Sequence, residues 1–465
     1  MDTKYNFDPL KIIKKALSKG GEFAELYLED AKNTSIILEE DKIEKVVSGR
    51  DRGAGVRLIS DLHTFYAYTN DLTEAGLLQA AEAVSAAAKA KKGSEVSDIN
   101  LAKKSVAEGF KILKASGGYA LDEKIKLVEV GNLTARKFDK RVRQVKVIYG
   151  DAMRAVNVIN SLGENIEELH SSILYLCQVV SEEGGIIQTG YEPVGGALGL
   201  EIFDETPPEV IATRAAERAI KMLSARKAPA GKMTVVLSSE AGGTMIHEAV
   251  GHGLEADLAN ENLSVYSGRI GEQVASKLIT VIDDGTIANK RGSGFFDGEG
   301  TPTARNVLVE NGILKTYMHD RLSAMKAGVQ STGNGRRESY QHRPIVRMTN
   351  TIIAPGKSNP DDVLKSLDKG LFVRKMGGGQ VNTVNGDFVF EVTEGYTVED
   401  GEICELVRGA TLTGNGPKVL MEIDMLATDL GYGKGTCGKD GQGVPVADAQ
   451  PTLRIPEIVV GGGVG

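Results

Sequence analysis

The hydrophobic and polar positions of the N-terminal half predict helices that alternate with clusters of strands. Residues 9–18 show helical spacing, and a second helix follows the capping pattern Asp71-Leu72-Thr73-Glu74. In that second helix an apolar stripe runs at helical intervals through Leu77, Leu78, Ala81, Val84 and Ala88. Strand-like stretches lie between the two helices, at residues 24–29, 35–38, 56–59 and 65–68.

Residues 120–226 repeat this scheme. A helix is followed by long strands, predicted over residues 145–159, 172–180 and 186–191, and then by a helix that begins at Thr206-Pro207-Pro208-Glu209. The repetition suggests an internal duplication. A linker at residues 227–231 ends this part of the chain.

The pattern changes after the linker. Asp284-Gly285, Asn311-Gly312 and Asp400-Gly401 each lie between apolar β-formers, as the tight turns of hairpins require. Helices become few. We therefore expect an α+β protein of two domains: an N-terminal α/β domain (1–228) with mixed or antiparallel sheets, and a mainly antiparallel β domain (229–465) with one conspicuous helix.

Composition fits a folded protein and narrows its class. Apolar residues make up 41% and charged residues 25%, while a net charge of −8 disfavours a nucleic-acid binder. No apolar run approaches the roughly 18 residues of a membrane span, and no secretory signal is visible. Three cysteines are too few for a disulfide framework, which favours a cytoplasmic location. Glycine is enriched, at 56 residues, without any collagen-like period.

The conspicuous helix carries the candidate chemistry: His247-Glu248-Ala249-Val250-Gly251-His252. Zinc-binding histidines on a helix are usually four residues apart, whereas these are five apart and would diverge by roughly 140° on an ideal helix. A π-bulge would restore their alignment, and Gly251 would tolerate the dihedral angles that it needs. The alternative is a surface helix with incidental histidines, which the adjacent glutamate and glycines disfavour.

A catalytic zinc site needs a third protein ligand and an open position for water. Within the same helix, Glu255 and Asp257 are acidic candidates for that ligand. Cys437, between Gly435 and Gly438, is about equally favoured, with Lys439 placed to keep its thiol deprotonated. The residues alone leave this choice open.

Three further patterns in the C-terminal half are less specific. Gly433 to Lys439 matches a phosphate-binding loop formally, but Asp440 and the absence of a following helix argue against nucleotide binding. The run Gly377, Gly378 and Gly379 could expose backbone amides to a peptide, or be a plain loop. Arg336 and Arg337 lie in a basic loop whose charge is either solvated or bound to a substrate carboxylate.

Three segments together resemble the TldD/PmbA family of bacterial and archaeal metallopeptidases, also described as modulators of DNA gyrase. They begin Thr244-Met245-Ile246-His247, Asn334-Gly335-Arg336-Arg337 and Cys437-Gly438-Lys439-Asp440, and run on to Asp257, Thr351 and Leu453. The intact histidine-glutamate motif resembles the TldD-type subunit, since the PmbA (TldE) partner lacks it.

The resemblance implies one Zn²⁺ per chain, held by His247, His252 and Cys437, with Glu248 as the catalytic base. It implies a two-domain chain that pairs with a TldE/PmbA-like partner or with itself and admits unfolded peptides. We therefore expect a peptidase acting on extended peptides, with Glu255 or Asp257 orienting a ligand imidazole. Two alternatives remain: a peptide-binding or assembly factor with structural zinc, and a non-enzymatic gyrase modulator.

Overall fold

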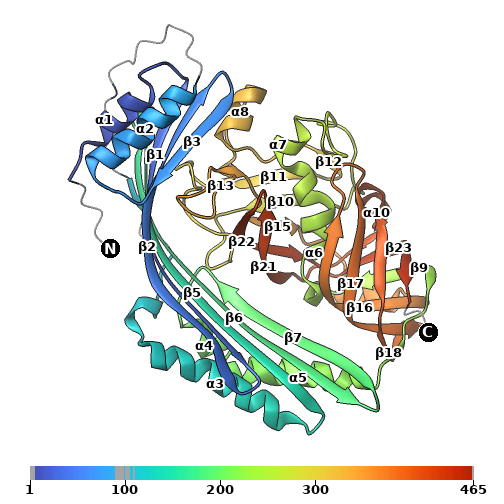
Figure 1. Ribbon diagram of the computed structural model, residues 1–465. Coiled ribbons are helices and arrows are strands. Elements are labelled where there is room, and N and C mark those ends of the chain that lie inside the picture. Colours follow the sequence, from blue (N-terminus) through green and yellow to red (C-terminus); the bar gives the residue numbers. More distant parts are fainter. Residues whose placement is uncertain (1–5, 89–98, 100–104, 108–109, 463–465) are drawn as a thin grey trace.

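The N-terminal half forms one long, curved sheet in the computed structural model, which describes residues 6–88, 99, 105–107 and 110–462 (Figure 1). The order is β3-β2-β1-β5-β6, and both β4 and β7 pair with β6. The strands are β1 (Phe23–Glu39), β2 (Lys42–Ser60), β3 (His63–Thr69), β4 (Ser105–Ala107), β5 (Val142–Asn160), β6 (Asn165–Glu183) and β7 (Ile186–Gly196). All the pairings are antiparallel except that of β4 with β6.

The strands are longer than the sequence predicts. The separate strands expected at residues 24–29 and 35–38 are one strand, β1, and its polar middle pairs with β2 on one side and β5 on the other. Asp30 lies in this middle stretch, where Arg50 of β2 forms an ion pair with it. Backbone pairing on both edges and this ion pair keep a polar segment in strand form, which hydropathy cannot indicate.

Helices cover the sheet in two groups. The first group, α1 (Pro9–Ala16) and α2 (Glu74–Ala87), packs against β1 and β2 around Leu26, Val56 and Leu77. The second, α3 (Leu121–Phe138) and α5 (Pro208–Leu223), packs against β5 and β6. Two short helices, η1 (Ser116–Gly118) and α4 (Ile202–Glu205), complete the N-terminal half. Helix, three strands and helix thus occur twice, the order that the predicted duplication would produce. Within the described residues, every helix is too short or too polar to cross a membrane.

The C-terminal half contains two large sheets, ordered β12-β11-β10-β15-β22-β21 and β16-β9-β23-β19-β17-β18-β8, with β20 added beside β23. Its strands are β8 (Arg226–Lys227), β9 (Gly231–Leu237), β10 (Val281–Asp284), β11 (Arg305–Glu310), β12 (Ile313–Leu314), β13 (Gly335–Arg336), β14 (Ile345–Val346), β15 (Asn350–Ile353), β16 (Lys369–Val381), β17 (Asp387–Glu399), β18 (Glu402–Arg408), β19 (Thr411–Asn415), β20 (Met425–Leu426), β21 (Gly431–Lys439), β22 (Gln442–Gln450) and β23 (Leu453–Gly461).

Helical segments between these sheets build the shared core. They are η2 (Ser239–Ala241), α6 (Thr244–Ile246), η3 (His247–Gly251), η4 (His252–Leu254), α7 (Ala256–Ala259), α8 (Arg321–Ala327), α9 (Pro360–Lys365) and α10 (Gly416–Glu422). One hydrophobic cluster joins residues of both sheets to α6 and η3, including Leu237, Ile246 and Val444. The α+β class is confirmed. The sheets are mixed, because β9 pairs with β16, and β15 with β22, in parallel.

Two of the three predicted hairpin turns are present. Asn311-Gly312 joins β11 to β12 and Asp400-Gly401 joins β17 to β18, all four residues having positive φ. The prediction for Asp284-Gly285 is wrong. There Asp284 accepts hydrogen bonds from the backbone and hydroxyl of Thr286, at 2.9 and 2.6 Å, and a long loop leads to β11. The aspartate side chain therefore starts a loop instead of a two-residue turn.

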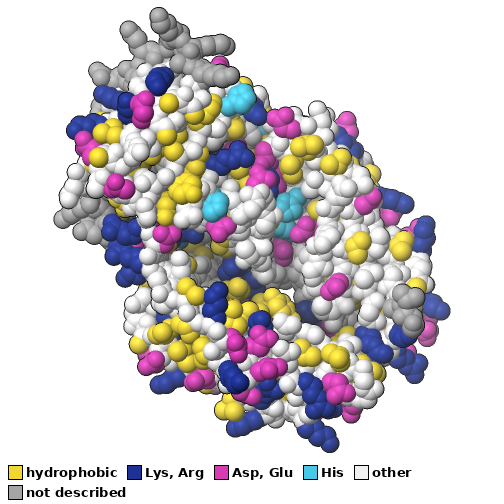
Figure 2. Space-filling model, viewed as in Figure 1, with side chains coloured by type: hydrophobic (Ala, Val, Ile, Leu, Met, Phe, Trp, Pro, Cys, Tyr) yellow, Lys and Arg dark blue, Asp and Glu magenta, His cyan; other side chains and the backbone are white. Residues whose placement is uncertain are grey.

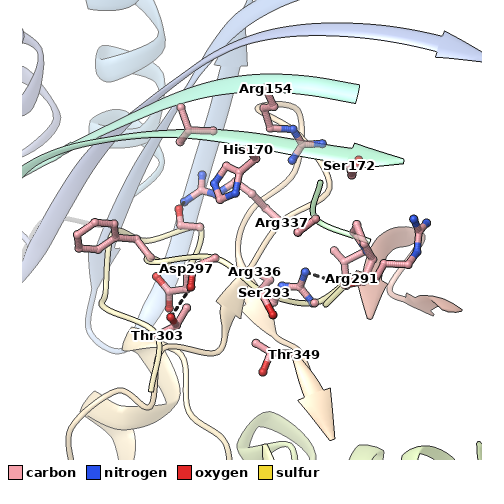
Figure 3. A pocket seen from close by; sticks show the side chains of 18 of the residues that line it. Arg154, His170, Ser172, Arg291, Ser293, Asp297, Thr303, Arg336, Arg337 and Thr349 are labelled. Carbon is pink, nitrogen blue, oxygen red and sulfur yellow. Dashed lines mark hydrogen bonds between the residues drawn. The ribbon is translucent and has the colours of Figure 1, made fainter. Parts of the chain in front are cut away.

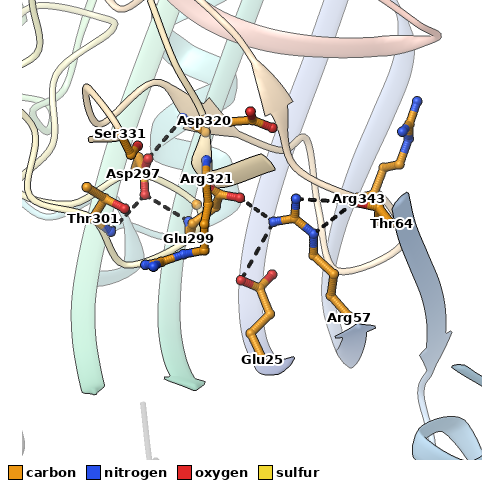
Figure 4. Close-up of polar contacts among 12 residues, drawn as sticks. Glu25, Arg57, Thr64, Asp297, Glu299, Thr301, Asp320, Arg321, Ser331 and Arg343 are labelled. Atoms are coloured by element: carbon orange, nitrogen blue, oxygen red, sulfur yellow. Dashed lines mark hydrogen bonds and ion pairs between the residues drawn. The ribbon is translucent and has the colours of Figure 1, made fainter. Parts of the chain in front are cut away.

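Buried charges join the two halves (Figure 4). Arg57 of β2 forms an ion pair with Glu299 of the C-terminal half, and neither side chain is exposed. Arg337 reaches the opposite way and pairs with Glu25 of β1, while its guanidinium lies 4.2 Å from the ring centroid of Tyr27. The surface between the halves is hollowed (Figure 2). Of the two alternatives predicted for Arg337, a solvated charge is wrong, because this side chain is buried.

Replacing Arg57 by Ala should lower the free energy of unfolding by about 3–5 kcal/mol, since it leaves buried carboxylates without their cation. Urea unfolding followed by circular dichroism measures the loss. The matched control is Arg226→Ala, whose ion pair with Glu405 is exposed and should contribute about 1 kcal/mol or less. Equal losses in the two variants would contradict a buried junction.

Candidate metal centre

The helical segment after β9 is distorted where the spacing of the histidines demands it. The chain is a π-helix over His247–Gly251, and the backbone N–H of His252 donates to the carbonyl of His247, five residues earlier. The predicted π-turn is therefore present. It places the two imidazoles side by side, with ring centroids 5.1 Å apart and planes at 85°.

Glycine at position 251 has a different role from the predicted one. Its φ and ψ, −53° and −55°, are ordinary right-handed helical values that any residue can adopt. A Cβ at this position would lie 2.0 Å from the sulfur of Met348. Gly251 is thus needed for close packing against Met348 and not for its dihedral freedom.

Cys437 reaches the histidines from β21. This strand pairs with β22 through the turn Asp440-Gly441, so the segment that resembles a phosphate loop is a β-hairpin. The Cys437 sulfur lies 3.4 Å from Nε2 of His252. One ligand atom from each of His247, His252 and Cys437 lies within 4.8 Å of the others.

This donor set fits zinc. In tetrahedral coordination, Zn–N and Zn–S bonds of about 2.1 and 2.3 Å separate nitrogen from sulfur by about 3.6 Å, close to the distance found here. Nδ1 of His247 is buried without a hydrogen-bond partner among the described residues, while Nδ1 of His252 contacts Glu255 at 3.0 Å. Three protein donors leave a fourth position open, which is the pattern of catalytic zinc.

The histidines prepare the thiol for a metal. Burial opposes ionisation of Cys437, but hydrogen bonds and charges from His247 and His252 lower its pKa to about 5. By contrast, burial raises the pKa of Cys177 to about 12, because that thiol lies in the N-terminal core without a cation. Cys437 is the thiol suited to bind a metal as thiolate.

A buried chain of charges supports His252. Glu255, fully buried, accepts from both Nδ1 of His252 and Nζ of Lys439, each at 3.0 Å. Burial works against its charge, but His252 and Lys439 bring the pKa of Glu255 to about 2. Lys439 also contacts Asp257 at 2.7 Å. Lys439 thus binds the carboxylates of Glu255 and Asp257. It was predicted to keep the Cys437 thiol deprotonated, and its contacts do not support that role.

Glu248 lies beside the metal centre. Its side chain is partly buried, and burial raises the pKa of its carboxyl, while the neighbouring histidines act in the opposite direction. A carboxyl whose pKa is raised toward neutrality is better matched to proton transfer. Glu248 lies on the π-turn directly after His247. The sequence predicted a glutamate beside the metal at this position.

The glycine run lies within a strand instead of a loop. Gly377, Gly378 and Gly379 form the far part of β16, which pairs irregularly with β17 there and packs against η3. The pairing of β16 with β9 ends at Val373, so beyond it that edge has no strand partner among the described residues. A Cβ on Gly379 would clash with the ring of Phe390, 1.9 Å away, which explains one of the glycines.

The structure separates the two predicted arginines. Arg337 is engaged by Glu25 at the junction of the two halves. Arg336 donates to the carbonyls of Met348 and Pro445, at 2.6 and 2.7 Å, and borders a cavity. The sequence did not indicate Arg347, which donates to the carbonyls of Cys437 and Gln442 and so braces the cysteine hairpin. It follows directly after the buried strand β14, the one local sign of its burial.

Two histidines on a π-turn and a cysteine on a β-hairpin define a class of metalloprotein, and comparisons identify its family. Three family models match this chain: domain 1 of PmbA/TldA metallopeptidases at residues 24–88, their central domain at residues 115–223 and their C-terminal domain at residues 230–462. A metalloprotease TldD homolog of Haemophilus influenzae is 40% identical over 95% of this chain and 93% of its own. The chain belongs to the PmbA/TldD metallopeptidase family.

Other similar proteins agree with this assignment. A zinc metalloprotease TldD homolog of Saccharolobus solfataricus is 28% identical over 97% of this chain and 99% of its own. The fold is similar to that of a Thermotoga maritima protein whose crystal structure is described as a candidate modulator of a DNA gyrase. The TM-score is 0.78 and the sequence identity 23%, over 97% of this chain and 99% of the other. The fold is also similar to that of TldE from Thermococcus kodakarensis, with a TM-score of 0.76 and 18% sequence identity over 97% of this chain and 100% of the other.

Alkylation of metal-free protein should report the lowered pKa of Cys437. In a Cys404→Ser background, iodoacetamide should react at a rate that is half-maximal near pH 5 and level above pH 6, because the thiolate then predominates. The Cys437→Ser variant is the control. A rate that keeps rising to pH 8 would show an ordinary thiol.

Replacing Glu255 by Gln should weaken metal binding about 10- to 100-fold, because the partner that orients His252 is lost. Competition with a chromophoric chelator measures the affinity. Asp257→Asn is the matched control, since Asp257 contacts Lys439 and not a histidine, and its effect should be smaller. Equal effects would argue against orientation of His252 by Glu255.

Proposed function

We propose that this protein is a zinc-dependent peptidase that hydrolyses extended, unfolded peptides. The observation that carries the proposal is the approach of one atom each of His247, His252 and Cys437 to within 4.8 Å, beside a glutamate. The metalloprotease names of its relatives support the peptidase activity, and one relative's name supports zinc. One ion per chain is the stoichiometry that a single cluster predicts.

When bound, zinc supplies a Lewis acid that polarises the scissile carbonyl and acidifies water. His247 and His252 bind it as neutral imidazoles, and Cys437 binds it as a thiolate. Glu255 holds the proton on Nδ1 of His252, so that Nε2 is free as a ligand. Glu248 takes the proton of the attacking water and delivers it to the leaving amine.

Substrate docks at the unpaired edge of β16. The segment Gly377–Gly379 lacks side chains, and the strand that carries it, β16, contacts the helical segment of the histidines, so an extended peptide paired with this strand would run toward the metal. Pairing of this kind recognises backbone groups and is compatible with many sequences. An unfolded chain exposes such extended segments along its length, which favours unfolded peptides as substrates.

The two alternative functions, the partner subunit and the cellular location are still predictions. A peptide-binding factor would use the same edge and a structural zinc, and a gyrase modulator would act without hydrolysis. The resemblance to TldE from Thermococcus kodakarensis supports assembly with a TldE-like partner or with a second copy of this chain. A cytoplasmic location and the absence of direct nucleic-acid binding are predicted from composition alone.

The Glu248→Gln variant should retain its zinc and lose peptide hydrolysis by a factor of about 10²–10⁴, because it cannot accept the proton. Zinc content by atomic absorption and cleavage of an unfolded reporter peptide are measured on the same samples. The companion variant, Cys437→Ala, should lose the metal itself. Binding of zinc and peptide without cleavage by the unmutated protein would favour the binding factor. Unchanged cleavage by Glu248→Gln would remove Glu248 as the catalytic base, and full zinc content in Cys437→Ala would remove Cys437 from the ligand set.

A further inference from the structure

A cavity of about 130 Å³ lies between the N-terminal sheet and the C-terminal half (Figure 3). Arg154 and His170, cross-strand neighbours on β5 and β6, enter it from the sheet. Arg291 and Arg336 enter it from the C-terminal half. We call the part of the cavity lined by Arg154, Arg291 and Arg336 the arginine pocket.

The cations of the arginine pocket are poorly compensated. Among the described residues, Arg291 donates to neutral acceptors only: the carbonyls of Gly435 and Ile173, and the hydroxyl of Thr436. Arg336 likewise donates to two carbonyls. For Arg154 the one recorded ion pair among the described residues is to Glu29, at 3.8 Å.

The carboxyls that border the cavity are directed at backbone amides. Asp297 accepts from the N–H groups of Glu299, Thr301 and Gly335, each at 2.9 Å. Burial, followed by the charge of Glu299, raises its pKa well above the ordinary value. Glu338 accepts from the N–H of Gly443 at 2.6 Å. The arginine pocket therefore keeps an excess of positive charge, and partly dehydrated guanidinium groups favour an anionic ligand.

The pocket adjoins the metal centre through the cysteine hairpin. Arg291 contacts Thr436, the residue before Cys437, and Val444, which pairs with Cys437, borders the cavity. The thiolate of Cys437 is also close enough to act on the pKa of Arg336, which burial lowers to about 10. The cysteine hairpin thus borders both the metal centre and the arginine pocket.

We infer that the arginine pocket is a subsite that binds a carboxylate of the peptide substrate. Planar guanidinium groups match the geometry of a carboxylate, and the cavity has room for a small group of this kind. The carboxylate comes either from the C-terminus of the peptide or from an aspartate or glutamate side chain. The inference rests on the proposed function, since it assigns part of the specificity of that enzyme.

Binding of three labelled peptides to zinc-loaded Glu248→Gln protein tests this inference, with fluorescence anisotropy as the readout. The peptides share one sequence without acidic residues: one has a free C-terminal carboxylate, one is amidated, and one is amidated but carries a single aspartate. At least one carboxylate peptide should bind about 10- to 100-fold more tightly than the plain amide. The peptide that gains shows which source of carboxylate the pocket takes.

Arg154→Gln should abolish this preference and leave the affinity for the plain amide unchanged, because Arg154 is partly exposed and does not brace the hairpin. Arg305→Gln, at an exposed position of β11, is the matched control and should keep the preference. Equal binding of all three peptides, or a preference that survives Arg154→Gln, would overturn the subsite while leaving the peptidase intact. Failure of every peptide to bind would overturn the proposed function and the subsite with it.

Discussion

The contact between the sulfur of Cys437 and Nε2 of His252, at 3.4 Å, joins segments 185 residues apart in the chain. Most of the C-terminal half serves this contact. The π-turn aligns the two imidazoles, Gly251 lets Met348 pack closely against that turn, and Arg347 fixes the backbone of the cysteine hairpin. The thiolate and the imidazoles also lower one another's cost of burial, because hydrogen bonds and charges from both histidines lower the pKa of Cys437.

The two halves of the molecule meet through buried charges and through one small apolar cluster of Tyr27, Val156, Val158 and Tyr340. Arg57 and Arg337 cross the junction in opposite directions and share the neighbourhood of Glu25. Buried ion pairs of this kind add little net stability, but they are satisfied in one arrangement only. The junction therefore defines how the long sheet lies against the catalytic half, and with it the shape of the arginine pocket.

The sequence predicted the fold class, the distorted helix and the two hairpins with positive φ, because these depend on local chemistry. It split β1 into two strands, because the pairing that stabilises its polar middle comes from β2 and β5. It could not choose between Cys437 and the acidic residues by spacing, since the choice depends on tertiary contacts. The assignment of Lys439 failed for the same reason: nearness in sequence to Cys437 did not reveal that its side chain turns to Glu255 and Asp257.

The position of Cys437 in the chain has a consequence for biosynthesis. Both histidines and Glu248 are synthesised near the middle of the chain, whereas the cysteine lies on a hairpin that follows almost all of the other strands. The strand that carries it must then insert beside β22, which itself pairs with β15. A nascent chain thus exposes its own unfolded segments while its three-ligand centre is still incomplete. Under the proposed function, the order of synthesis delays completion of the active site until nearly all of the chain has been made.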